Sequence, residues 1–437
     1  MYVPARGGGE GLGNFEVVAR GDELHLFHVV LPAADRVAHL VSRDGLAWRR
    51  LPDALRIGPP GRFDDGAIVA IAVVRGAGTH HMLYEARAAE RGSEARIGSA
   101  QSDDLVHWRP MEHAVQAAAH LYAPKTTRVG EREFRTVAAT FVADAPLHRR
   151  AAIAVHRSRE AAELGPRTSA FAPRSTTRLQ SPQLFTVAGD WYLTASVPSE
   201  SRQRYWVGAS ADGPWRAPDR DQLLPSGLDL VRVFSHAGRL ACIGRFADES
   251  GGAVLGPAEL THGGDGALVA RRWNGWDARR GTATHLGPPT PSWEDGPPTS
   301  SLSAPFGTAM WHWGDPGSCF ELEVTLEADA TRFGVALGLD RDGGALLARF
   351  DRGAQRVTLV EARGETRVIQ SSPWSGRPRP QVRLRRWADA IEMDVDGVVV
   401  LAAVAPTRRG RLGIVVESGT AEVTHARLFN VDPPITT

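Results

Sequence analysis

Polar side chains that could bind or act on a small molecule recur at the starts of short apolar segments. Asn14 opens "NFEVVA", Gln180 opens "QSPQLFTV", and Tyr122 and Lys125 share "YAPKTTRV". Amides donate and accept hydrogen bonds without charge, whereas a phenol and an ammonium can take part in proton transfer when burial tunes their pKa values. This set of groups indicates a site for a small polar ligand, at which orientation and hydrogen bonding could do the chemistry.

Charged residues near the same segments are candidates for ligand binding. Glu16 lies two residues after the first amide, and the paired acids Asp64 and Asp65 precede a glycine. The pair either forms a turn or binds ligand hydroxyls. Asp229 and Arg232 in "LDLVRVF" either meet a polar ligand or hold their strand as an ion pair.

Two histidines lie in "MEHAVQAAAHLYAPK" (111–125). On a helix His113 and His120 would be two turns apart, too far to share one ion, and no carboxylate-rich partner follows. We therefore expect no metal and no cofactor. His120 beside Tyr122 and Lys125 would supply a base, a phenol and a cation; the alternative is that all three are ordinary turn and strand residues.

A repeated strand pattern must position these candidates. A glycine-containing turn followed by an alternating strand recurs about every 50–57 residues. The copies are "RGDELHLFHVV" (20–30), "GAGTHHMLYEA" (76–86), "VGEREFRTVAA" (129–139), "AGDWYLTASV" (188–197) and "HAGRLACIGRF" (236–246).

A second motif follows the same period. Each copy is a strand that ends in Ser-x-Asp and is followed by a Trp: "LVSRDGLAW" (40–48), "AQSDDLVHW" (100–108) and "GASADGPW" (208–215). Asp after a strand is turn chemistry, and we expect the Trp to pack one repeat against the next.

The short strands and the period predict an all-β fold, a five-bladed β-propeller of four-stranded blades over residues 1–290. Residues 291–303 read as a Pro/Gly linker. From 304 to 437 long alternating strands with short glycine turns at Asp342-Gly343-Gly344 and Asp396-Gly397 predict an antiparallel β-sandwich. In a propeller the first strand of each blade lines a central funnel; these strands should be 13–19, 64–74, 122–129, 180–187 and 228–234.

Composition excludes several classes of protein. The net charge is +1 with acids and arginines interspersed, which gives no reason to expect nucleic acid or an anionic membrane as partner. Two cysteines are too few for a disulfide framework, and neither a secretory signal nor a long apolar run is present. We expect a cytoplasmic protein with a small-molecule ligand; the sequence does not indicate its oligomeric state.

The order and the amino-acid sequences of these strands resemble those of glycoside hydrolase family 32, the β-fructosidases, invertases and their five-bladed relatives. "LGNFEVVARGDELHLFHV" is similar to the family's opening strand, and "FDDGAIVAIAVV" with "IGSAQSDDLVHW" to its second blade. "LYAPKTT" falls where the family has Arg-Asp-Pro, and "LQSPQLF" where it has Glu-Cys-Pro. The resemblance spans nearly the whole chain and implies a propeller followed by a sandwich.

The catalytic positions depart from the family pattern. The resemblance puts the nucleophile at Asn14, the transition-state-stabilising Asp at Ala123 and the acid/base Glu at Gln180. A retaining glycosidase needs two carboxyl groups about 5 Å apart, which amides and alanine cannot replace.

Three functions remain open. The first is a repurposed enzyme, fitting specialised metabolism, that performs cyclisation, rearrangement, elimination or transfer on a sugar-like molecule. The second is a non-catalytic sugar or polyol binder, a pseudoglycosidase. The third is an active β-fructosidase whose carboxylates come from Glu16, Asp64 or Asp65.

Overall fold

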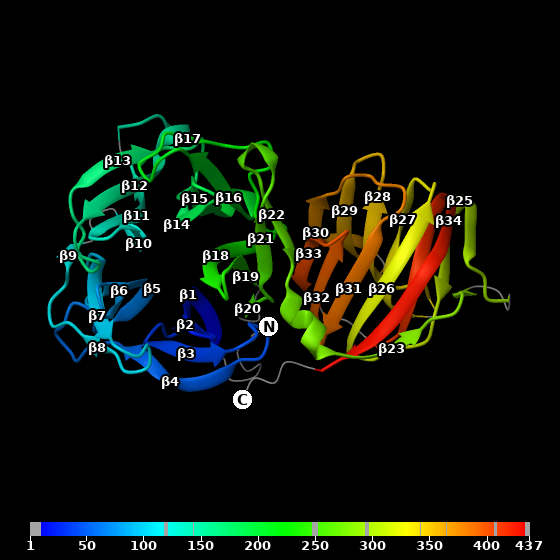
Figure 1. Ribbon diagram of the computed structural model, residues 1–437, viewed down its shortest axis with the longest axis horizontal. Coiled ribbons are helices and arrows are strands. Elements are labelled where there is room, and N and C mark those ends of the chain that lie inside the picture. Colours follow the sequence, from blue (N-terminus) through cyan, green and yellow to red (C-terminus); the bar gives the residue numbers. More distant parts are fainter. Residues whose placement is uncertain are drawn as a thin grey trace. The chain divides into compact units, whose positions relative to one another are not determined.

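The computed structural model describes residues 10–117, 121–142, 144–246, 252–292, 297–340, 342–363, 365–405 and 409–432. The chain forms two compact units (Figure 1). The first contains the chain up to Leu223 together with Leu228–Val269, and the second contains Leu224–Gly227 and most of the chain from Ala270 on. The division into residues 1–290, 291–303 and 304–437 stays a prediction.

Five antiparallel sheets in the described part of the first unit form the blades of a propeller. Blades I and II contain β1 (Gly11–Arg20), β2 (Glu23–Leu31), β3 (Arg36–Ser42) and β4 (Arg49–Arg56), then β5 (Ala67–Arg75), β6 (His80–Arg87), β7 (Arg96–Ser102), β8 (Arg109–Pro110) and β9 (Gln116–Ala117). Blades III and IV contain β10 (Tyr122–Gly130), β11 (Glu133–Phe141), β12 (Ala151–Ser158) and β13 (Arg167–Phe171), then β14 (Gln180–Val187), β15 (Asp190–Val197), β16 (Arg202–Gly208) and β17 (Trp215–Arg216). Blade V contains β18 (Leu228–His236), β19 (Arg239–Phe246), β20 (Ala253–Val254), β21 (Ala258–His262) and β22 (Leu268–Arg272), the last of which continues into the second unit.

The first strand of each blade is innermost. Figure 1 shows β1, β5, β10, β14 and β18 around the middle of the ring, and β1 contacts β5, β5 contacts β10 and so on until β18 contacts β1 again. The second strands of the blades, such as β2 and β11, are buried on both faces, because each blade packs against two others. The cluster from Phe27 to Leu105 between blades I and II is one such core. The predicted five-bladed fold and its five inner strands are confirmed.

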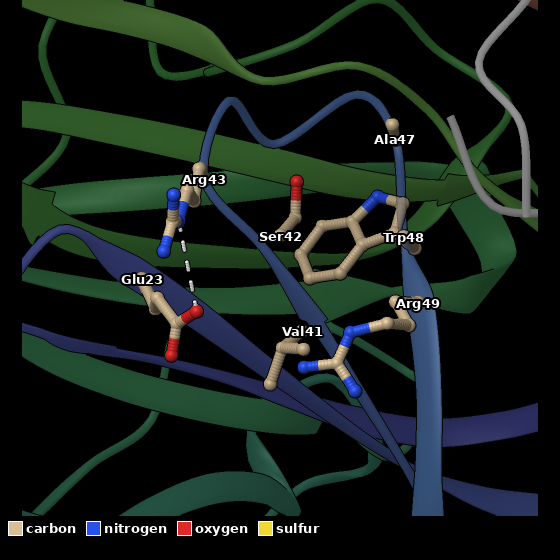
Figure 2. Close-up of a pocket in the computed structure, with 7 residues that line it drawn as sticks. All are labelled: Glu23, Val41, Ser42, Arg43, Ala47, Trp48 and Arg49. Atoms are coloured by element: carbon tan, nitrogen blue, oxygen red, sulfur yellow. Dashed lines mark ion pairs between the residues drawn. The ribbon is translucent and has the colours of Figure 1, made fainter.

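The Ser-x-Asp motif builds the turn at the outer edge of a blade. In blade I the Oδ1 of Asp44 accepts hydrogen bonds from the backbone N–H groups of Leu46 (2.8 Å) and Ala47 (2.9 Å) and from the Ser42 hydroxyl (3.0 Å). Trp48 closes the turn with 1% of its surface exposed. Figure 2 shows this turn and the pocket of about 280 Å³ beside it, with Glu23 ion-paired to Arg43 at 3.8 Å.

The same turn in blade IV links neighbouring blades. Arg135 of β11 in blade III, 5% exposed, makes a bidentate pair with Asp212, at 3.0 and 2.9 Å. The corresponding turn in blade II contacts blade I, because the Arg20 guanidinium of blade I donates to the backbone carbonyl of Asp104 at 2.7 Å. The turn motif therefore fixes blades to one another as well as closing hairpins.

The second unit is a β-sandwich. Its strands are β23 (Arg280–His285), β24 (Thr290–Pro291), β25 (Ser301–His312), β26 (Cys319–Ala328), β27 (Arg332–Leu339), β28 (Ala345–Asp351), β29 (Arg356–Arg363), β30 (Glu365–Pro373), β31 (Gln381–Trp387), β32 (Ala390–Val395), β33 (Val398–Val404) and β34 (Arg411–Val431). Short 3₁₀ segments are η1 (Leu147–Arg149), η2 (Pro198–Glu200), η3 (Gly264–Gly266) and η4 (Asn274–Arg279).

β34 joins the two layers of the sandwich. Its first half pairs with β25 and β27, and its second half pairs with β26 and β23. β34 is one continuous strand, in which Ser418 has φ 52°. Among the described residues, no helix has the length and apolarity needed to cross a membrane.

Candidate functional site

Each inner strand has a β-bulge near its beginning. The pairing with the second strand of the blade shifts between Leu12 and Phe15, Ile68 and Ala70, Tyr122 and Lys125, Gln180 and Gln183, and Leu228 and Leu230. Bulges re-aim side chains and occur beside active sites. We call one residue from each of these five bulges, Asn14, Val69, Ala123, Ser181 and Asp229, the bulge ring.

Asn14 connects three of the inner strands. Its amide nitrogen donates to the Ser181 hydroxyl at 3.0 Å, and its amide oxygen accepts the backbone N–H of Ile71 at 3.1 Å. Ser181 is buried and has φ 48°, and Ala123 in blade III has φ 47°. Neither residue is a glycine, so each backbone is held in a conformation that costs free energy, as is common at functional sites. Asn14 itself is half-buried.

Asp229 is paired rather than free. The Arg245 guanidinium forms a bidentate ion pair with its carboxylate, with Nε 2.8 Å from Oδ1. The same arginine donates to the Leu12 carbonyl at 2.9 Å, which ties blade V to blade I. Arg245, rather than Arg232 as one reading of the sequence had it, is therefore the ion-pair partner of Asp229.

Three predicted candidates form a buried charge cluster next to the bulge ring. The Glu16 carboxylate is ion-paired with Lys125 and lies 3.8 Å from the Arg232 Nε. Arg232 also donates to the backbone carbonyls of Phe15 (2.9 Å) and Ser181 (3.1 Å). Burial, together with the nearby Arg232, lowers the pKa of Lys125. Exposures of 0% for Glu16, 7% for Lys125 and 1% for Arg232 make this cluster a connection between strands rather than a surface for a ligand.

Glu85 is a site residue that the sequence analysis missed. It lies on β6, has 2% of its surface exposed, and its Oε2 accepts the backbone N–H of Ala123 at 2.9 Å. Its Oε1 has no hydrogen-bond partner among the described residues. Burial raises the pKa of the Glu85 carboxyl group. The one signal in the sequence was an acid at an interior position of an apolar strand, "HMLYEA".

Tyr122 and Gln180 lie beside the bulges of blades III and IV. Tyr122 is half-buried, and the Arg178 guanidinium carbon lies 4.1 Å from its ring centroid, a cation–π contact. Gln180 is exposed and pairs with Ser196 across the β14–β15 ladder. His120 lies outside the described residues.

Asp64 and Asp65 organise the loop between blades I and II. The Asp64 carboxylate accepts hydrogen bonds from Arg62 (2.9 Å) and the Tyr84 hydroxyl (2.8 Å). Asp65 accepts the backbone N–H groups of Gly61 and Ala89, each at 2.7 Å. Of the two readings from the sequence, these contacts favour a turn over direct ligand binding.

Each carboxylate near the bulge ring is therefore either paired with a cation or buried. Glu16 and Asp229 are each paired with a cation, and Glu85 is buried with a raised pKa. Gln180 is exposed, and Asn14, Tyr122 and Ala123 are half-buried. Such a set can hydrogen-bond a neutral polyol and receive or supply a single proton, whereas a double displacement at an anomeric carbon needs two carboxyl groups.

Solved structures of sugar-cleaving enzymes share this fold. The β-fructofuranosidase of Bombyx mori, of glycoside hydrolase family 32, matches 98% of this chain and 92% of its own at 16% identity, with a TM-score of 0.71. A sucrose-6-phosphate hydrolase from Lactobacillus gasseri matches 97% and 92% at 14% identity (TM-score 0.76). The exo-inulinase of Aspergillus awamori matches 97% and 96% at 14% identity (TM-score 0.74).

The likeness is one of fold. No protein-family model matches the chain, and no curated protein does. The propeller and sandwich of family 32, expected from the sequence, are confirmed.

Proposed function

We propose that the bulge ring and its flanking residues bind a small polar, sugar-like molecule, and that the chain transforms it without the two-carboxylate mechanism of glycosidases. Cyclisation, rearrangement, elimination and transfer are the reaction classes that need only orientation, hydrogen bonding and one proton donor or acceptor. Such a reaction fits specialised metabolism in the cytoplasm.

The observation that carries this proposal is the state of the carboxylates. An attacking carboxylate must reach the anomeric carbon, but Glu16 is fully buried against Lys125, and Asp229 is bidentate to Arg245. The amides of Asn14 and Gln180 stand where the resemblance puts the nucleophile and the acid/base group. They favour recognition of hydroxyl groups over attack on a glycosidic bond.

Glu85 would supply the proton. A carboxyl group that keeps its proton at higher pH than usual can act as a general acid. Because Glu85 is 2% exposed and its unpartnered Oε1 is buried, it would pass the proton through a bound water rather than contact the ligand directly. Its position against the Ala123 backbone puts it beside the bulge of blade III. Tyr122, held by Arg178, borders the same bulge.

A non-catalytic binder is the second candidate. It is favoured by the structural role of Asn14, whose amide already donates to the Ser181 hydroxyl and accepts the backbone N–H of Ile71 in the free protein. An active β-fructosidase receives no support from the contacts of Glu16, Asp64 and Asp65, each of which is used by neighbouring side chains or backbone.

Two solved structures of the same fold that contain a bound sugar guide the choice of ligands to test. One structure is a variant fructan exohydrolase from Cichorium intybus in complex with 1-kestose, and another is a Bombyx mori variant in complex with sucrose. Titration calorimetry with sucrose, 1-kestose and a panel of free sugars and polyols tests binding. We expect at least one ligand to bind, and the double substitution Asn14→Ala with Gln180→Ala to weaken it by about tenfold or more, about 1.4 kcal/mol.

Gln101→Ala, an amide removed from β7 of blade II, is the matched control and should leave the affinity unchanged. Unaltered affinity in the double variant would refute a site at the inner strands. Conversion of the bound ligand by the wild-type chain, followed by mass spectrometry, separates the enzyme from the binder.

A further inference from the structure

The loop that Asp64 and Asp65 organise is built to hold one arginine at a cavity wall. Asp64, 2% exposed, fixes the Arg62 guanidinium through contacts of 2.9 and 3.2 Å and is itself fixed by the buried Tyr84 hydroxyl. Arg62 also donates to the Met111 carbonyl at 3.1 Å, which ties this loop to the segment that follows β8. An arginine held by three hydrogen bonds to two residues has lost most of its rotamer freedom before any ligand arrives.

At two glycines of this loop, the surrounding atoms leave no room for a larger residue. A Cβ at Gly58 would lie 2.3 Å from the Asp64 Oδ1, and a Cβ at Gly66 would lie 2.6 Å from the backbone of Ala88. Side chains at both positions would displace the aspartate or the chain. The loop is therefore fixed at both ends as well as by its carboxylates.

A cavity of about 550 Å³ lies between this loop and the segment after β8. Arg62 and Phe63 line it from the loop, Arg96 from the start of β7, and Glu112 and His113 from the segment after β8. Its volume falls within the range of about 300–1,000 Å³ that is usual for small-molecule sites. None of these residues belongs to the bulge ring.

The charges at the cavity favour an anion. The lining residues Arg62, Arg96 and Glu112 give the wall a formal charge of +1 with His113 neutral. Arg62 is neutralised in part by Asp64, whereas Arg96 is exposed and has no ion pair among the residues that the structure describes. Guanidinium groups bind carboxylates and phosphates in planar, bidentate geometry.

Phe63 adds an apolar surface. Its ring is half-buried and stacked on Tyr84 at 6.3 Å between centroids, so its orientation is fixed. A carbon skeleton could lie against it while Glu112 accepts hydrogen bonds from hydroxyl groups. We propose that this cavity binds a sugar-sized molecule that carries a carboxylate or phosphate group, with Arg96 and Arg62 as its anion contacts.

Binding of glucose 6-phosphate, gluconate and glucose to the full chain, measured by titration calorimetry at low salt, tests this proposal. At least one of the two anionic sugars should bind, and glucose should bind at least about tenfold more weakly. Which of the two binds identifies phosphate or carboxylate as the preferred group. Arg96→Gln should weaken binding of the anionic sugar about tenfold or more. Added salt should weaken the same binding in the wild-type chain.

Arg109→Gln is the matched control, since Arg109 is an exposed arginine of the same blade that pairs with Asp103 instead of lining the cavity. It should leave the affinity unchanged. The proposal is overturned if neither anionic sugar binds, if glucose binds equally well, or if Arg96→Gln has no more effect than Arg109→Gln. Because the cavity is separate from the bulge ring, Asn14→Ala with Gln180→Ala should not alter this binding, and the two proposals fail independently.

Discussion

At the scale of single residues, the candidate site is defined by which polar groups already have a hydrogen-bond or ion-pair partner within the protein. Asn14 and Lys125 were predicted from their places at strand starts, and the structure brings both to the inner strands. Glu85 could not be found in this way, because it lies on the second strand of its blade and reaches Ala123 only through the packing of β6 against β10. Pairing choices such as Arg245 for Asp229 depend on side-chain geometry that no sequence spacing encodes.

The protonation of Glu85 is the prediction that belongs to this scale. Its pKa is raised in the folded chain by burial, so the stability that its protonated form contributes is present at low pH and is lost as the pH rises through the folded pKa. Glu85→Gln keeps the acceptor for the Ala123 N–H and removes the charge. Its stability relative to the wild type should therefore increase with pH, by at most about 1.4 kcal/mol per pH unit.

Urea denaturation of both chains between pH 4 and pH 8 measures this difference. Glu133→Gln is a control at a solvent-exposed carboxylate whose pKa is lowered by Arg135, so its pH dependence should have the opposite sign. Parallel curves for the wild type and Glu85→Gln would show that Glu85 is ionised at no cost, and would remove it as the proton donor.

At the scale of elements, turn chemistry and strand order were predictable whereas bulges were not. The Ser-x-Asp motif predicted the hairpin turns because Asp and Ser bond the backbone locally, and Asp44 and Asp104 do so. The bulges at Ala123 and Ser181 have positive φ without glycine, so nothing in their residue types marks them. They arise because the first strands of different blades must fit one another, and that fit is a tertiary constraint.

Blade I provides the prediction at this scale, since β2 and β3 contain three buried histidines. Burial lowers the pKa of His25 to about 4, that of His28 to about 4 and that of His39 to about 3. The Nδ1 of His25 lies 2.9 Å from the Nε2 of His39, and the His39 ring stacks on Phe27 at 4.3 Å.

All three rings stay neutral in the folded chain while the unfolded chain takes up protons near pH 6.5. The stability associated with these neutral rings is complete above pH 6.5 and is lost as the pH falls towards 4, at up to about 1.4 kcal/mol per pH unit for each ring. Chemical denaturation at pH 7.5 and pH 5 should show this loss. His39→Phe should reduce it, and His148→Phe, at an exposed position in η1, should not. Equal losses in all three chains would show that buried histidines do not determine the acid response.

At the scale of the whole molecule, the sequence predicted the architecture because repetition encodes it. Five copies of a turn and strand specify five blades, and the change to longer alternating strands marks the sandwich. The fold is shared with fructosidases at 10–16% identity, since packing of alternating apolar residues tolerates wide substitution. Function does not follow from such a likeness, because it depends on the few groups at the inner strands.

Sucrose hydrolysis by the purified chain tests the central claim most directly, namely that this propeller holds no working pair of carboxylates at its inner strands. Released glucose and fructose are measured over the pH range 4–8 with enzyme at micromolar concentration. We predict no release above the rate without protein. Turnover within the range of about 1–1,000 s⁻¹ that is typical of enzymes would contradict the claim and would mean that two carboxyl groups act on the glycosidic bond after all.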